Sequence, residues 1–152
     1  MSKFKIYFKS ILIPLLIGGI VSIIISGSID YNSLQKPPFA PPSILFPIMW
    51  TILYILMGVS YGLLEERKLT DSSVNTIYYL QLFVNAFWSI FFFNLKWRLF
   101  AFVWIVLLVV LVFIMILTFY KKFKAAGLLQ IPYLIWSLFA TYLNLFIFLL
   151  NR

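Results

Sequence analysis

The sequence predicts an all-α membrane protein, a bundle of five transmembrane helices in a single domain over residues 1–152. Three observations predict this fold class. Hydrophobic residues make up 64% of the chain, and the mean hydropathy is +1.05. The 12 basic and 4 acidic residues lie in short clusters separated by five uncharged stretches. Each stretch has about 20 residues or more, the length that a helix needs to cross a bilayer.

Membrane topology explains the positive charge of the chain. The formal net charge is +8, and most basic residues fall before the first stretch, after the second and after the fourth. Basic residues collect in cytoplasmic connections. We therefore expect an integral membrane protein with a cytoplasmic amino terminus, and we expect no nucleic-acid partner.

The residue inventory excludes most kinds of reactive site. The sequence has no cysteine and no histidine, and the five stretches carry no charge. Zinc sites, thiolate chemistry and the usual haem ligands are therefore not expected, nor is a conventional nucleophile with its base. We predict no metal site and no obligatory cofactor. What remains for binding is aromatic surface, with five Trp, nine Tyr and seventeen Phe.

The first helix is expected over residues 6–26. Gly18, Ser22 and Ser26 recur there at every fourth position. A stripe of small residues lets another helix approach closely, so we interpret these three as packing residues.

A proline-rich loop follows the first helix. The segment Lys36-Pro-Pro-Phe-Ala-Pro-Pro42 holds four prolines, which fix φ and lack an N–H. It cannot be helical, yet it is stiff. Long ordered loops are often functional covers, so we predict that this loop covers a pocket. Ser43 is the expected N-cap of the next helix.

The second helix, residues 44–64, carries two patterns. Trp50, Tyr54 and Tyr61 share one face at helical spacing, and residues 58–62 form a Gly-x-x-x-Gly pattern on an adjoining face. This pattern suits either tight contact with another helix or the seam of a homodimer. Both interpretations stay open.

The third helix, residues 74–94, carries Gln81, Asn85 and Ser89 in line, with Trp88 beside them. Amides at membrane depth are costly unless they meet partners or a cavity. The line therefore predicts either hydrogen bonds between helices or a ligand site.

The last two helices differ in character. The fourth, residues 99–120, is almost wholly Leu, Val, Ile and Phe, and we expect it to face lipid. The fifth covers residues 128–150, and Pro132 should bend it. An aromatic, a small residue and an amide share one of its faces: Trp136, Ala140 and Asn144.

Three motifs resemble those of the TspO/MBR family of tryptophan-rich sensory proteins, which includes the mitochondrial translocator protein. The first joins the proline-rich segment to Phe46-Pro-Ile-Met-Trp-Thr-Ile-Leu-Tyr-Ile-Leu-Met-Gly58. The second is Asn85-Ala-Phe-Trp-Ser-Ile-Phe-Phe92. The third is Pro132-Tyr-Leu-Ile-Trp-Ser-Leu-Phe-Ala-Thr-Tyr-Leu-Asn144. They occur in the family's order and cover nearly the whole chain.

The resemblance implies a five-helix bundle in a bacterial cell membrane, often dimeric, with a pocket for tetrapyrroles such as protoporphyrin and for isoquinoline or benzodiazepine-type drugs. Members similar to this chain are credited with light-dependent breakdown of protoporphyrin, for which Trp50 and Trp136 are the matching residues. No basic residue follows Tyr142 within five positions, so the family's carboxyl-terminal cholesterol motif is missing. The implied pocket residues are Tyr31, Pro41, Trp50, Asn85, Trp88, Trp136 and Ala140.

Three hypotheses about function follow. The first is a membrane protein that senses, sequesters or transports porphyrin, with Lys36, Lys96 and Arg98 as candidate contacts for the ligand's propionates. The second is an enzyme that degrades porphyrin photochemically through Trp50 and Trp136. The third is a structural membrane subunit whose aromatic face binds another protein.

Overall fold

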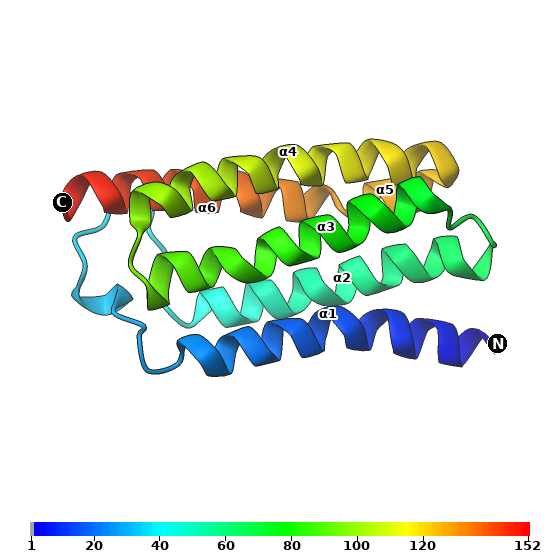
Figure 1. The fold of residues 1–152 in the computed structure, drawn as a ribbon, viewed down its shortest axis with the longest axis horizontal. Helices are drawn as coiled ribbons and strands as arrows, with labels where there is room; N and C mark the ends of the chain where they lie inside the picture. Colours follow the sequence, from blue (N-terminus) through cyan, green and yellow to red (C-terminus); the bar gives the residue numbers. More distant parts are fainter. Residues whose placement is uncertain (1) are drawn as a thin grey trace.

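Five helical segments run along the length of the protein in the computed structural model, which describes residues 2–152 (Figure 1). All five are long and apolar enough to cross a membrane, which confirms the predicted fold class. The elements are α1 (Lys3–Ile25), η1 (Tyr31–Ser33), α2 (Leu45–Glu66), α3 (Ser72–Ser89), η2 (Ile90–Asn94), α4 (Arg98–Lys122), α5 (Lys124–Leu128) and α6 (Ile131–Leu150).

The connections alternate between the two ends of the bundle. The amino terminus, the α2–α3 turn and the α4–α5 turn lie at one end. The long α1–α2 loop, the α3–α4 connection and the carboxyl terminus lie at the other, which we call the lid end (Figure 1). Of the 23 residues of α1, the buried ones are Ser10, Pro14, Val21 and Ile25, so α1 is a peripheral helix.

The glycine pair of α2 is used inside the protomer. A Cβ added at Gly58 would lie 2.4 Å from Ile11 Cα and 2.6 Å from the Ser10 carbonyl oxygen. One added at Gly62 would lie 2.7 Å from the ring of Tyr7. The alternative that this pattern forms a homodimer seam is therefore wrong, because α1 covers it. The close contact needs glycine, since any side chain would push the two helices apart.

The fourth span is not purely lipid-facing, which corrects the prediction from its composition. Seven of its residues are buried at helical spacing: Ala101, Ile105, Leu108, Leu111, Val112, Met115 and Phe119. This stripe packs against α3 and α6. Residues that face lipid and residues that face the core are equally apolar in a membrane, so composition alone could not separate the two faces of α4.

Two helix boundaries differ from the predictions. Ser43 does not cap α2, because the N-cap is Ile44 and no side chain caps this end. The bend expected at Pro132 lies before it, since α5 ends at Leu128 and α6 begins at Ile131. Pro132 occupies the first turn of α6, where backbone N–H groups have no partner within the helix, so the missing N–H of proline costs no hydrogen bond.

The third span ends in a π-helical turn that the sequence did not predict. The N–H of Leu95 donates to the carbonyl of Ile90 at 2.9 Å, and Lys96 has a φ of 57°. Phe92 and Phe93 within this turn are buried. A π-turn shifts side chains around the helix axis, and here it coincides with aromatic residues that reach the lid end.

Candidate ligand-binding site

A cavity of about 370 Å³ lies at the lid end, between α1, α2 and the end of the third span. Its volume falls within the ordinary range of small-molecule sites, roughly 300–1,000 Å³. The lining residues are Leu15, Gly18, Gly19, Val21, Ser22 and Ile25 of α1, Ile29, Tyr31 and Ser43 of the loop, Phe46, Pro47, Trp50, Thr51 and Tyr54 of α2, and Ser89 and Phe93.

The two long walls of this cavity differ in chemistry. On α2, the rings of Trp50 and Tyr54 are stacked with centroids 5.8 Å apart, and Phe46 lies one turn before Trp50. The facing wall on α1 consists of small and aliphatic residues, with Gly18 in contact with the Tyr54 ring. An aromatic wall opposite a flat aliphatic wall suits a planar apolar molecule.

Tyr31 closes the cavity at the loop. Its side chain is 2% exposed, its ring meets Phe46 edge-on at 5.0 Å, and its hydroxyl donates to the carbonyl of Pro41 at 2.6 Å. Burial raises the pKa of the Tyr31 phenol above its ordinary value. Pro41 does not line the cavity, and it positions Tyr31 through this hydrogen bond.

Further bonds fix the loop to the carboxyl-terminal helix. The hydroxyl of Tyr142 donates to the carbonyl of Pro38 at 2.7 Å. Asn151 exchanges two hydrogen bonds with the backbone of Gln35, at 2.9 and 2.8 Å. The loop is therefore held over the bundle from the α6 side.

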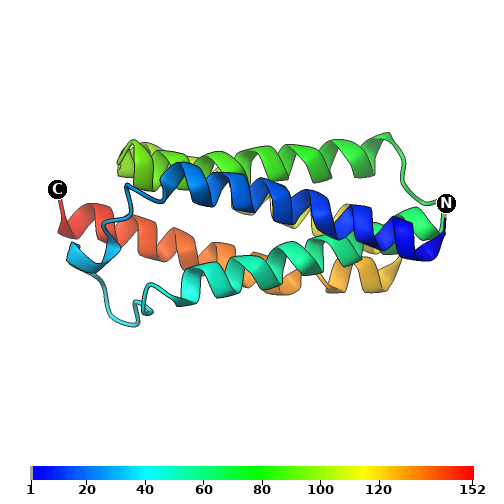
Figure 2. The ribbon, with the colours of Figure 1, turned by 90° about the horizontal axis from the view of Figure 1, so that it is seen from below.

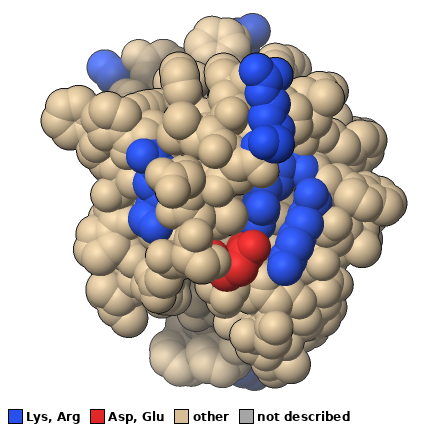
Figure 3. All heavy atoms as spheres, turned by 90° about the vertical axis from the view of Figure 1, so that its left-hand side faces the viewer, with Lys and Arg blue, Asp and Glu red and all other residues tan. Residues whose placement is uncertain are grey.

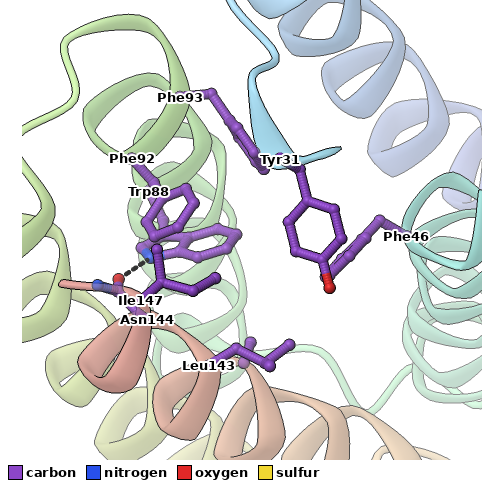
Figure 4. Close-up of a pocket in the computed structure, with 9 residues that line it drawn as sticks. Tyr31, Phe46, Trp88, Phe92, Phe93, Leu143, Asn144 and Ile147 are labelled. Carbon is purple, nitrogen blue, oxygen red and sulfur yellow. Dashed lines mark hydrogen bonds between the residues drawn. The ribbon is translucent and has the colours of Figure 1, made fainter. Parts of the chain in front are cut away.

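Trp88 and Ala140 line a second, much smaller cavity of about 10 Å³ (Figure 4). Tyr31, Phe46 and Phe93 line both cavities, so these rings form the partition between them. The indole N–H of Trp88 donates to Asn144 Oδ1 at 2.9 Å. Trp88 is thus held in place on the far side of the partition and does not reach the larger cavity.

Asn85 belongs to a buried chain of hydrogen bonds. Tyr54 donates to Asn85 Oδ1 at 2.6 Å, and Asn85 Nδ2 donates to the Tyr133 hydroxyl at 2.7 Å. Tyr133 in turn donates to Gln81 Oε1 at 2.7 Å. Gln81 and Asn85 therefore form hydrogen bonds between helices, as one of the two interpretations predicted. Ser89, one turn after Asn85, lines the cavity. Asn85 does not line the cavity, but it is hydrogen-bonded to Tyr54, which does.

Trp136 lies behind Trp50. Their ring centroids are 6.4 Å apart and nearly perpendicular, and Trp136 also meets Phe46 at 5.8 Å. It is 7% exposed and lines neither cavity. Its Nε1 has no hydrogen-bond partner among residues 2–152. The two tryptophans of the sequence hypothesis thus differ in their access to a ligand.

None of the three candidate propionate contacts lines either cavity. They belong to the α1–α2 loop and to the residues around the start of α4, at the lid end, where basic side chains gather around an acidic one (Figure 3). Arg98 Nη2 contacts both carboxylate oxygens of Asp30, at 2.8 and 3.0 Å, and Lys96 lies 3.6 Å from the same carboxylate. Lys36 Nζ donates to the carbonyls of Tyr31 and Leu34. All three cations already have partners within the protein, and they stabilise the loop.

The sequence interpretation missed the α1 wall of the cavity. Gly18 and Ser22 were assigned to helix packing, because a stripe of small residues usually allows close helix contact. Gly18 does contact Tyr54, but Gly18 and Ser22 also line the cavity. The small polar side chain of Ser22 was the available signal, because it suits the wall of a cavity as well as a helix contact. In the structure Ser22 is exposed.

The comparisons with known proteins agree with one another. The sequence profile of the TspO/MBR family matches residues 10–150. The chain is 42% identical over 145 residues to the tryptophan-rich protein TspO of Archaeoglobus fulgidus, covering 93% of this chain and 94% of that one. It is 40% identical over 124 residues to the protein of that name in Chlorobaculum tepidum, with 80% and 78% covered. Against the translocator protein of Ovis aries it is 33% identical over 120 residues, with 75% and 70% covered. With its five spans and a cavity beneath the proline-rich loop, this chain therefore belongs to the TspO/MBR family.

Proposed function

We propose that this protein binds a tetrapyrrole, such as protoporphyrin, within the membrane and acts in its sensing, sequestration or transport. The observation that carries the proposal is the cavity of about 370 Å³ with an aromatic wall on α2 and an aliphatic wall on α1. Family membership, with relatives named tryptophan-rich sensory protein and translocator protein, supports a small-molecule role.

The chemistry of the cavity favours a flat, largely apolar ligand. Burial of apolar area contributes about 25 cal/mol per Å², and each aromatic pair adds about 0.5–1.5 kcal/mol. Smaller flat molecules, such as isoquinoline or benzodiazepine-type compounds, satisfy the same requirement. The described residues that line the cavity include no cation, so propionate groups would have to project from the cavity towards its edge.

A titration tests the proposal. Protoporphyrin is added to the protein in lipid nanodiscs, and binding is followed by quenching of tryptophan fluorescence. Trp50→Ala should weaken binding by about tenfold or more, since it removes a stacking surface and buried area. Trp97→Ala is the matched control, because Trp97 is 54% exposed and lies outside the cavity. Equal affinities for the two variants, or no quenching in the native protein, would contradict the proposal and favour a structural role.

A specific observation favours light-dependent porphyrin degradation as the second candidate function. Trp50 lines the cavity, and both Trp88 and Trp136 lie 6.4 Å from it, measured between ring centroids. Indoles are readily oxidised, and a group of three in contact could supply an electron to a photoexcited ligand. Loss of porphyrin absorbance under constant illumination, beside a dark control, tests this function.

A further inference from the structure

The larger cavity has an exposed edge between α1 and α2. Most of its lining residues are buried or half-buried, but four on the two neighbouring helices are exposed: Gly19 and Ser22 of α1, and Pro47 and Thr51 of α2. Each pair is separated by about one helical turn. All four lie in segments that are long and apolar enough to span a membrane, so lipid would border the opening once these segments cross a bilayer.

The packing of α1 against α2 explains why the opening lies at this end. The helices are in tightest contact near the amino terminus, where Gly58 meets the backbone of Ser10 and Ile11. Tyr7 and Ser10 also donate hydrogen bonds to Glu66 and Glu65 there, at 2.5 and 3.3 Å. From this crossing the two helices diverge towards the lid end (Figure 2). The cavity occupies the wide part of the resulting V.

The loop side of the cavity is fastened, whereas the α1–α2 side is not. Movement of the loop would require breaking the contacts of Asp30 with Arg98, of Pro38 with Tyr142 and of Gln35 with Asn151. At the α1–α2 edge the Thr51 hydroxyl donates within its own helix, to the carbonyl of Pro47 at 2.7 Å. A molecule that passes there breaks none of these bonds between elements.

We propose that the ligand reaches the cavity sideways from the bilayer, through an opening between α1 and α2 bordered by Gly19, Ser22, Pro47 and Thr51. The loop is then a fixed roof and does not open for each binding event. An apolar ligand already dissolved in lipid crosses no aqueous phase on this route. The inference rests on the proposed function for the identity of the ligand, but the opening itself can be tested without one.

A plug in the opening should slow both binding and release. A Cβ at Gly19 would meet nothing within 4 Å, so Gly19→Trp can be accommodated and places a large ring at the edge. Ile20→Trp is the matched control, because Ile20 is 57% exposed but lies outside the cavity. Protoporphyrin is delivered from preloaded vesicles, and association and dissociation are timed by its fluorescence.

We expect Gly19→Trp to slow both association and dissociation by about tenfold or more, because both use the same opening. Ile20→Trp should match the native rates. Native association rates in Gly19→Trp would overturn the proposal. So would faster association when Tyr142→Phe and Asn151→Ala together loosen the loop.

A second measurement does not depend on porphyrin. The sequence has no cysteine, so Ser22→Cys gives one site for a nitroxide spin label, with Ile23→Cys as the lipid-facing control at 76% exposure. Both labels should collide mainly with oxygen, which concentrates in lipid, and little with a water-soluble nickel complex. Frequent nickel collisions at residue 22 alone would show a water-filled mouth and overturn the proposal. If the native protein binds no porphyrin, the proposed function fails, and this measurement still decides the opening.

Discussion

Trp50 and Trp136 occupy different places relative to the ligand cavity, although the sequence motifs treat them alike. Trp50 lines the cavity directly, while Trp136 is buried behind it with its ring edge-on to Trp50. Because Trp50 can touch a ligand, its substitution should change both the affinity for the ligand and any reaction of it. Trp136 can affect such a reaction only through its contact with Trp50. The two substitutions to phenylalanine should therefore separate binding from degradation.

We predict that Trp50→Phe weakens protoporphyrin binding by about 1–2 kcal/mol, because phenylalanine keeps an apolar ring but loses part of the stacking area. Trp136→Phe should change affinity less. If the protein degrades porphyrin, both variants should lose most of that activity, because the oxidisable indole is gone. Binding is measured by quenching of the remaining indoles, and degradation by absorbance decay in light.

The outcome distinguishes the two candidate functions. A double variant that degrades porphyrin at the native rate would show that the indoles only form the wall, and the enzyme hypothesis should then be dropped. Failure of Trp136→Phe to bind would show that this buried ring maintains the shape of the cavity.

The hydroxyl of Tyr54 should matter more for stability than for binding. Tyr54→Phe keeps the ring on the cavity wall but leaves Asn85 Oδ1 without its donor in a buried environment. The expected loss is about 1–3 kcal/mol of stability, seen as a lower midpoint of thermal unfolding in detergent. Tyr120→Phe, at an exposed interfacial position, is the control and should leave the midpoint unchanged. Equal midpoints for Tyr54→Phe and the native protein would argue against the hydrogen-bond chain.

At the scale of the helices, the closest contact between α1 and α2 depends on the absence of a side chain at Gly58. We predict that Gly58→Ala lowers the thermal midpoint strongly, because the new methyl group would lie 2.4 Å from Ile11 Cα and the backbone of α1 must move. Gly19→Ala has open space and should be neutral or slightly stabilising, since alanine favours helix by about 1 kcal/mol over glycine. Midpoints measured side by side check this contrast, and a larger loss for Gly19→Ala would contradict the packing described.

The positions of the helices could be predicted from the sequence, but which face of each helix is buried could be predicted only in part. The length of an uncharged stretch is a local property, so the five spans follow from the sequence. The direction of a side chain depends on neighbours far along the chain. Composition therefore could not assign the buried stripe of α4, nor could the Gly58–Gly62 pattern choose between α1 and a second protomer. The π-turn at Ile90–Asn94 has no sequence signal of its own.

The site was predictable to a similar degree. Tyr31 and Trp50 were expected in the pocket and line the larger cavity, while Trp88 and Ala140 line the smaller one. The cations assigned to propionates are paired or hydrogen-bonded within the protein, and the preference of Arg98 for Asp30 follows from a fold that brings residues 68 positions apart together. A spacing rule within one helix cannot reveal such a pair.

At the scale of the whole molecule, orientation in the membrane is the open question with the simplest test. The bias of basic residues predicts that the amino-terminal end is cytoplasmic and that the lid end is external. Ser33 and Ser72 are both exposed and lie at opposite ends of the bundle. An impermeant thiol reagent applied to intact cells should label Ser33→Cys and not Ser72→Cys, and both should react once the cells are opened. Labelling of Ser72→Cys alone would reverse the orientation.

The hydrogen-bond chain from Tyr54 through Asn85 and Tyr133 to Gln81 also constrains how the protein is made. It joins α2, α3 and α6, and it includes neither α1 nor α4. An amide without a partner in hydrocarbon is costly, yet Tyr133 belongs to the last of the five spans in chain order. Asn85 Nδ2 and Gln81 Oε1 must therefore wait in the membrane, or in the insertion machinery, until that span has been made. Of the five spans, the first made is a peripheral helix, and the last completes the buried hydrogen bonds.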